Sequence, residues 1–179
     1  MTAQEKNKPG IGFVVKWIIA FVVANVVSLL LMSGVLLLTQ TLKLPAWLAI
    51  VLVPLIMGAV LGAGQGLIMM PYLDRSELWI ALTALGYACG YIIPTLLNLD
   101  PFLKYGLLGL MMGGLQWLVL RRAVQSSVWW IGVNVACWLA VPLFGDDGAL
   151  LYSPVTGFAM MWLLNHTKQQ LTESTQPSV

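Results

Sequence analysis

The fold is decided by the segment Gly109-Leu110-Met111-Met112-Gly113-Gly114-Leu115-Gln116-Trp117-Leu118-Val119-Leu120-Arg121-Arg122, which is apolar until it ends in two arginines. Gly109 and Gly113 lie four residues apart, and Gln116 follows three residues later. At about 100° per residue, these three positions fall within roughly 60° of one another on one face of a helix. The segment therefore predicts a helix that carries small residues and one amide along a single face.

The same spacing occurs three times along the chain. The small residues of the three copies are Gly58 and Gly62, Gly109 and Gly113, and Ser153 and Gly157. Each pair is followed three residues later by a longer side chain, which is Gln65, Gln116 or Met160. The copies begin 51 and then 44 residues apart, and a period of this size is typical of repeat proteins. We expect the small residues to let neighbouring helices approach closely, within this chain or in a partner.

The composition indicates an integral membrane protein. Of 179 residues, 59% are hydrophobic and only 9% are charged, whereas about a quarter of a soluble domain is charged. The net charge of +2 is too small to indicate a nucleic-acid partner. Cys89 and Cys137 have neither the spacing of a disulfide framework nor that of a metal site.

Hydropathy predicts an all-α membrane protein of six transmembrane helices, arranged as three helical hairpins. The spans are 13–39, 46–70, 78–97, 102–120, 128–144 and 149–164, within hairpins of about 13–70, 78–122 and 128–166. They form one domain, 13–166, between an N-terminal segment, 1–12, and a tail, 167–179, that we expect to be disordered. The last two spans are short against the roughly 20 residues a bilayer requires, so a re-entrant hairpin stays open as an alternative. Asp100 and Ser76 are expected to cap the helices that follow them.

The positive charges predict the orientation. With six spans, seven of the nine lysines and arginines share a side with both termini: Lys6, Lys8, Lys16, Arg75, Arg121, Arg122 and Lys168. Only Lys43 and Lys104 fall on the other side. The positive-inside rule therefore places both termini in the cytoplasm.

The first helix of each hairpin also follows a template. A tryptophan stands near each cytoplasmic start, at Trp17, Trp79 and Trp130. Small or polar pairs follow at Asn25 and Ser28, Gly86 and Cys89, and Asn134 and Cys137. We expect these three tryptophans, together with Trp129, Arg121 and Arg122, to lie at the membrane interface, where aromatic and basic side chains anchor helices. The two arginines could also bind lipid phosphate.

The block from Gly109 to Arg122, followed by Trp129-Trp130, resembles an uncharacterised group of multi-span bacterial membrane proteins. Their sequences repeat Gly-x-x-x-Gly-x-x-Gln-Trp-x-x-Leu-Arg-Arg and then a Trp-Trp helix. The likeness is close over residues 109–130 and loose over 58–90, and Met160 and Asn165-His166 replace Gln and Arg-Arg in the last copy. The resemblance implies a repeated helical fold in a bacterial cytoplasmic or internal photosynthetic membrane, and it implies no activity.

Four amides are the candidate buried polar residues: Gln65, Gln116, Asn25 and Asn134. An unpaired amide in hydrocarbon costs several kcal/mol, so each should face protein or a wet cavity. They are interpreted first as interhelical hydrogen bonds worth about 0.6 kcal/mol each. The alternative is the polar lining of a ligand pocket.

The sequence offers little catalytic chemistry. No Asp, Glu, Lys, Arg or His lies in the middle of a span, which argues against a proton relay, a pump or an ion-coupled transporter. The single histidine, His166, is a candidate pigment or haem ligand but is more simply a headgroup contact. Asp146 and Asp147 stand in a glycine-flanked turn without further metal ligands nearby. No hydrolase, metalloprotease or phosphate-loop motif occurs, so we expect a protein that is not an enzyme.

Three functions remain as hypotheses. The first is a non-enzymatic structural or accessory subunit of a larger membrane complex or a homo-oligomer. The second is a small-molecule-binding or transport subunit, similar in size to the membrane components of vitamin-uptake systems, with Trp, Asn and Gln around a pocket near the outer face. The third is a pigment- or quinone-binding subunit. The sequence identifies no cofactor, partner complex or oligomeric state.

Overall fold

The computed structural model describes residues 8–73, 75–124 and 126–166, which form helices and no strand. The helices are α1 (Ile11–Thr41), α2 (Ala46–Met69), α3 (Ser76–Leu96), α4 (Pro101–Ala123), α5 (Trp129–Phe144), α6 (Asp146–Leu150) and α7 (Tyr152–Leu164). The predicted all-α fold is confirmed. The tail 167–179, residues 1–7 with Lys6, and Lys168 lie outside the described residues, as do the side chains of Asp146 and Asp147.

Four helices are long and apolar enough to cross a membrane, namely α1, α2, α3 and α4. The last two apolar helices are shorter, at Trp129–Phe144 and Gly148–Leu164. The helices fall close to the six predicted spans, and the turn at Gly145 separates the last two. At 1.5 Å per residue, the 31 residues of α1 extend about 46 Å, longer than a hydrocarbon core of about 30 Å.

One predicted helix start is confirmed and one is wrong. The Asp100 side chain accepts hydrogen bonds from the backbone N–H groups of Phe102 and Leu103, at 2.9 and 3.2 Å, with Pro101 in the first helical position. Ser76 does not cap α3, because the helix already includes it and the preceding Arg75 is in the left-handed conformation, with φ of 63°. The chain therefore turns sharply at Arg75 without a side-chain cap.

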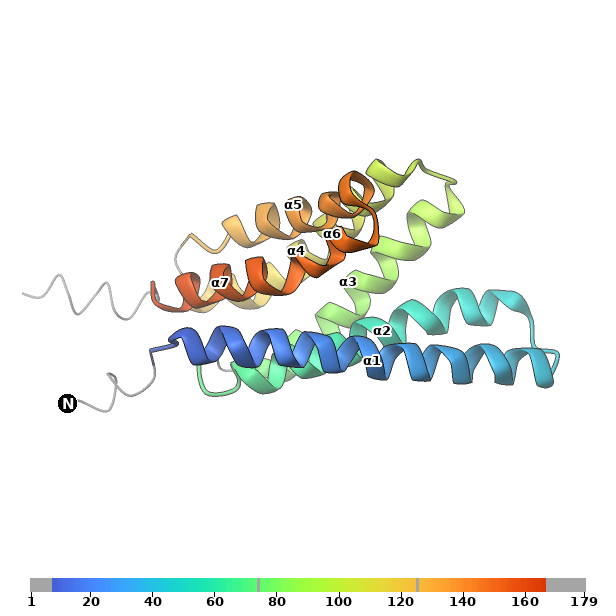
Figure 1. The fold of residues 1–179 in the computed structure, drawn as a ribbon, viewed down its shortest axis with the longest axis horizontal. Helices are drawn as coiled ribbons and strands as arrows, with labels where there is room; N and C mark the ends of the chain where they lie inside the picture. The colour runs from blue at the N-terminus through green and yellow to red at the C-terminus, as the bar shows by residue number, and fades with distance from the viewer. Residues whose placement is uncertain (1–7, 74, 125, 167–179) are drawn as a thin grey trace, which may run out of the picture.

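The helices form a closed ring around the centre of the molecule. Each long helix packs on its neighbour in sequence, and α7 closes the ring by packing on α1 and α5. Figure 1 shows the described chain entering and leaving at the same end, where the helices converge. At the other end, the α1–α2 turn and the α3–α4 turn diverge, and α3 crosses between the two groups of helices (Figure 1).

The glycine motifs lie where helices approach most closely. A Cβ atom on Gly109 would stand 2.7 Å from the Cα of Val135, and one on Gly113 would stand 3.0 Å from the Cα of Ile131. Gly58 would place a Cβ 2.8 Å from the Cα of Ala84. Gly58, Gly109 and Gly113 therefore pack on the helix that follows, α3 or α5, because only hydrogen fits at these backbone contacts.

Candidate functional site

Three tryptophans lie at the centre of the ring and not at its surface. Trp17, Trp79 and Trp130 are each 0% exposed. Their rings touch in series, with centroids 6.4 Å apart for Trp17 and Trp130 and 5.9 Å apart for Trp79 and Trp130. Their side chains therefore pack inside the bundle and not on its outer surface, and their depth at a membrane interface stays a prediction. These indoles are held inside because each has an acceptor for its N–H, which a buried indole requires.

Each indole donates to the helix before it around the ring. Trp79 Nε1 bonds to Gln65 Oε1 of α2 at 3.1 Å, and Trp130 Nε1 bonds to Gln116 Oε1 of α4 at 2.8 Å. Trp17 Nε1 bonds to Thr156 Oγ1 of α7 at 3.1 Å. We call the three tryptophans and these acceptors the tryptophan layer. The bond from α1 to α7 repeats the arrangement of the other two and joins the ends of the chain.

Further hydrogen bonds complete this layer around Gln116, which is 0% exposed. Its Nε2 atom donates to Thr83 Oγ1 at 2.9 Å and, at a longer 3.4 Å, to Gln65 Oε1. Asn134 donates to the backbone oxygen of Trp130, and its own Oδ1 accepts from the Tyr152 hydroxyl at 3.0 Å. Amides and hydroxyls from five helices, α2, α3, α4, α5 and α7, thus bond one another in a buried network.

One donor of this layer is left over. Gln65 is 1% exposed, and its Nε2 atom has no hydrogen-bond partner among the described residues. The Tyr152 hydroxyl is close enough to interact with the Gln65 side chain, but it forms no hydrogen bond of normal geometry with this nitrogen. The repeat explains this missing bond. Gln116 donates to Thr83 and Gln65, whereas the positions equivalent to these two acceptors around Gln65 hold Phe21 and Met160. Neither side chain replaces the oxygen that is missing there.

A second layer lies eight residues farther along the same three helices. Eight residues after Trp17, Trp79 and Trp130 come Asn25, Tyr87 and Trp138, which places them about 12 Å beyond the tryptophans. All three side chains line one cavity, together with Phe21, Ser28 and Met57. We call Asn25, Tyr87 and Trp138 the pocket layer.

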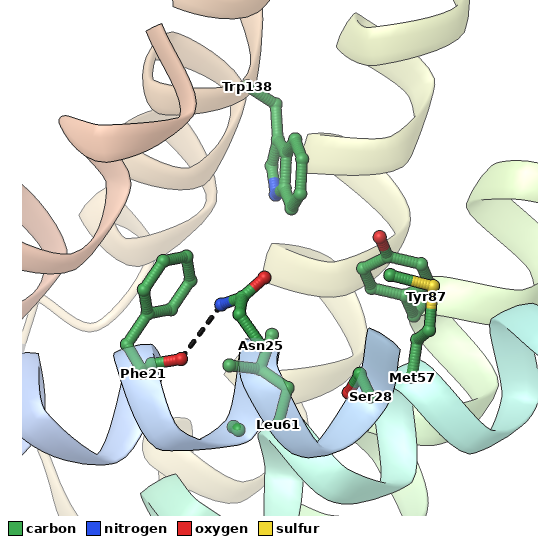
Figure 2. A pocket seen from close by; sticks show the side chains of 8 residues that line it. Phe21, Asn25, Ser28, Met57, Leu61, Tyr87 and Trp138 are labelled. Carbon is green, nitrogen blue, oxygen red and sulfur yellow. Dashed lines mark hydrogen bonds between the residues drawn. The ribbon is translucent and has the colours of Figure 1, made fainter. Parts of the chain in front are cut away.

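The cavity contains polar atoms that have no partner in the chain. Trp138 is buried, and its Nε1 atom has no hydrogen-bond partner among the described residues. Asn25 Nδ2 donates to the Phe21 backbone oxygen at 2.8 Å, which leaves Asn25 Oδ1 free. Figure 2 shows the Trp138 indole on one side of the cavity and Asn25 on the opposite side, on α1, with the Tyr87 hydroxyl between the two levels. The cavity volume is ≈ 30 Å³.

Tyr152 separates the two layers. Its ring stacks on Phe21, with centroids 5.3 Å apart, and lies against Trp138 at 5.2 Å. Its hydroxyl points the other way, to Asn134. One aromatic side chain therefore packs against two residues that line the cavity, Phe21 and Trp138, and supplies a bond to the tryptophan layer.

The other candidate residues are distributed around the molecule. Asn25 is exposed and not buried as expected, because it faces the open side of the cavity. Trp129 is 67% exposed and Arg122 is exposed, while Arg121 lies over the Trp117 ring at 5.2 Å. His166 is exposed at the end of α7, where its Nδ1 lies 2.7 Å from the Trp162 backbone oxygen. Ser153 and Gly157 are both buried, and Gly157 approaches the Trp17 ring.

Five residues that complete the two layers were not predicted from the sequence: Thr83, Thr156, Tyr152, Tyr87 and Trp138. A signal for most of them was present in the spacing from each tryptophan. Thr83 and Asn134 lie four residues after their tryptophans, whereas Asn25 lies eight residues after its own. Aligning Asn25 with Asn134 therefore placed it one level too near the tryptophans.

Comparison with known proteins gives no relative for this arrangement. No family model, curated protein or solved structure matches the chain. Among the described residues, no group of three or more His, Cys, Asp and Glu side chains is placed to hold a metal ion. The site is therefore interpreted from its own geometry.

Proposed function

We propose that the protein is a non-enzymatic integral membrane protein that serves as an accessory subunit, packing through one projecting hairpin against another membrane chain. The observation that carries this proposal is the far half of α1 and α2, residues 29–53, which we call the α1–α2 arm. None of its residues is buried. It projects away from α4, α5 and α7 in Figure 1.

The arm differs from the rest of the chain in what it leaves uncovered. In the most apolar window of α1 only 11% of residues are buried, against 39% in α4. Leu30, Leu37 and Trp47 are 60–70% exposed along the arm. Lipid can solvate such a surface, but helix association in membranes also uses small residues at the contact. Ser33 and Gly34 provide these, and nothing lies within 4 Å of a Cβ atom built on Gly34.

The interior of the bundle supports a packing role. Its polar side chains are amides, hydroxyls and indoles, and most bond one another in the tryptophan layer. Such a network specifies which helices meet and at what height. We further propose that the three glycine motifs and their tryptophans derive from one hairpin repeated three times.

For orientation, we propose six spans with both termini in the cytoplasm, on the basis of the charge split. In a variant with Cys89 and Cys137 changed to alanine, Ser126→Cys should react with an impermeant thiol reagent from the cytoplasmic side only. Lys43→Cys should react only from the opposite side. The reverse pattern would contradict the orientation.

The accessory role is tested by native mass spectrometry after mild detergent extraction from the membrane. We expect the wild-type chain in a larger assembly, whose mass shows whether the partner is a second copy or another protein. Gly34→Trp should release the monomer because it blocks close approach at the arm. Gly12→Trp, on the same helix but outside the arm, should not, since nothing lies within 4 Å of a Cβ atom there either. A wild-type monomer, or equal assembly of all three proteins, would refute the role.

A second candidate function is the binding of a small molecule. It is favoured by the cavity of the pocket layer, whose walls are aromatic and apolar with a few convergent polar groups, as in ligand sites generally. This function does not compete with the first, because the cavity lies between α1, α2, α3 and α5 and the arm lies beyond it.

A further inference from the structure

The cavity of the pocket layer presents unpaired polar atoms from three different helices. Trp138 Nε1 of α5 is a buried donor without a partner among the described residues. Asn25 Oδ1 and the Ser28 hydroxyl of α1, and the Tyr87 hydroxyl of α3, take part in no hydrogen bond to the described protein. A buried polar group without a partner costs about 1–3 kcal/mol. Of these atoms, Trp138 Nε1 is the buried one that bears this cost, while the other three border the same cavity. Together they indicate that something other than this chain satisfies the indole N–H.

The residues that line the cavity also argue against a charged occupant. No charged side chain lines the cavity, which is formed by Phe21, Ala24, Asn25, Ser28, Met57, Leu61, Tyr87 and Trp138. An ion would therefore enter apolar surroundings without a counter-charge, at a cost that few sites can offset. The lining therefore favours a neutral occupant.

The polar atoms define the functional groups of that neutral occupant. An indole N–H only donates, so Trp138 requires an acceptor. Asn25 Oδ1 only accepts, so it requires a donor. Ser28 and Tyr87 carry hydroxyls that serve as either. A carbonyl oxygen beside an N–H meets both requirements in a group of three heavy atoms.

The size of the cavity limits how much of the ligand enters. A volume of ≈ 30 Å³ exceeds the roughly 10–15 Å³ that one water needs, and it holds a small end group but no complete ring. Because Asn25 is exposed at its edge, the remainder of a ligand has a way out past α1. Phe21 and Met57 offer apolar surface to that remainder.

We propose that this cavity binds the neutral amide end of a small molecule, whose carbonyl accepts from Trp138 Nε1 and whose N–H donates to Asn25 Oδ1. The inference rests on the second function proposed above and adds the chemical class of the ligand. It does not depend on the accessory role of the α1–α2 arm.

The experiment compares three probes of similar shape, benzamide, benzoate and toluene, by calorimetric titration into the purified full-length chain in mild detergent. Benzamide should bind, benzoate should not because of its charge, and toluene should bind at least about tenfold more weakly because it lacks both polar groups. Asn25→Leu should weaken benzamide binding several-fold and leave toluene binding unchanged. Because Asn25 is exposed, this variant is expected to fold.

Trp138→Phe removes the donor and keeps an aromatic ring. It should weaken benzamide by about tenfold, whereas Trp129→Phe on the same helix should have no effect because Trp129 is 67% exposed. If benzoate or toluene binds as tightly as benzamide, or if neither pocket variant changes benzamide binding, the amide class is wrong although small-molecule binding stands. If no probe binds, the cavity holds only water, and both the class and the second function are wrong.

Discussion

The tryptophan layer and the pocket layer are built from the same three helices, eight residues apart, and yet they have opposite characters. In the first, indoles, amides and hydroxyls bond one another, and Gln65 Nε2 is left without a hydrogen-bond partner among the described residues. In the second, Asn25, Tyr87 and Trp138 face a cavity and do not bond one another. Equivalent positions of a repeat can therefore close a core at one height and open a cavity at the next.

The difference follows from the length of the last helix. α7 begins at Tyr152. The body of this helix packs beside the tryptophan layer, and only its first residue reaches the pocket layer, where it contacts Trp138. Toward the end away from the start of α1, the α1–α2 hairpin diverges from α4 (Figure 1). The ring has six members around the tryptophans and loses one of them at the cavity.

The largest expected effect is the loss of a central tryptophan. Trp130→Ala should lower the free energy of unfolding by about 3–5 kcal/mol, because it empties a fully enclosed volume and frees the acceptor Gln116. Trp129→Ala, one residue earlier and exposed to 67%, should change it by less than about 0.5 kcal/mol. Reversible unfolding in mixed micelles measures both. Similar losses for the two variants would contradict a closed tryptophan layer.

The next largest effect is expected where α4 and α5 approach closely, between the two layers. Gly109→Ala places a Cβ atom 2.7 Å from the Val135 Cα, so α4 and α5 must separate, at a cost of about 1–3 kcal/mol. Gly114→Ala is the matched control, because nothing lies within 4 Å of that position and alanine favours a helix. If Gly114→Ala lowered the stability as much as Gly109→Ala, the close contact between α4 and α5 would not be the reason for glycine at position 109.

The sequence predicted the helices well because their signal is local. Hydropathy marks each span, and Asp100 with Pro101 marks a helix start that the structure confirms. It could not place Trp17, Trp79 and Trp130, because a tryptophan near a helix end is suited equally to a membrane interface and to a core that offers an acceptor. For Trp17 the choice depends on Thr156, which lies 139 residues away and supplies the acceptor. For Trp79 and Trp130 it depends on Gln65 and Gln116 of the neighbouring helices.

The candidate site could be predicted only in part from the sequence, for the same reason. Gln65 and Gln116 stood out as amides in apolar segments, and the structure places both inside. Trp138 and Tyr87 gave no signal on their own, since aromatic residues are common in membrane helices. Their meeting with Asn25 depends on the relative heights of α1, α3 and α5, which hydropathy does not determine to within one turn.

At the unpaired Gln65 nitrogen, a substitution is expected to raise the stability and not to lower it. Met160→Gln restores the amide that the repeat has at the two other copies and offers an acceptor near Gln65 Nε2. We expect the free energy of unfolding to rise by about 0.5–1.5 kcal/mol, the net worth of one hydrogen bond. Met160→Leu, which keeps the position apolar, should give no gain. A loss of stability with glutamine would mean that the third copy cannot accommodate an amide.

The smallest effect distinguishes the two layers most directly, because one chemical change is made in each. Tyr152→Phe removes a hydroxyl that donates to Asn134 Oδ1 at 3.0 Å inside the tryptophan layer. Tyr87→Phe removes a hydroxyl that faces the cavity and bonds to no described residue. The first should cost about 1 kcal/mol, since it leaves the Asn134 oxygen buried and unpaired. The second should leave stability unchanged or raise it slightly, because no protein bond is lost and a polar group is removed from apolar surroundings.

Both rings stay in place, so the difference between the variants, measured by unfolding in the same micelles, reports only the two oxygens. Equal costs would mean that the Tyr87 hydroxyl is bonded as firmly as that of Tyr152, and the pocket layer would then be a second closed layer of the core.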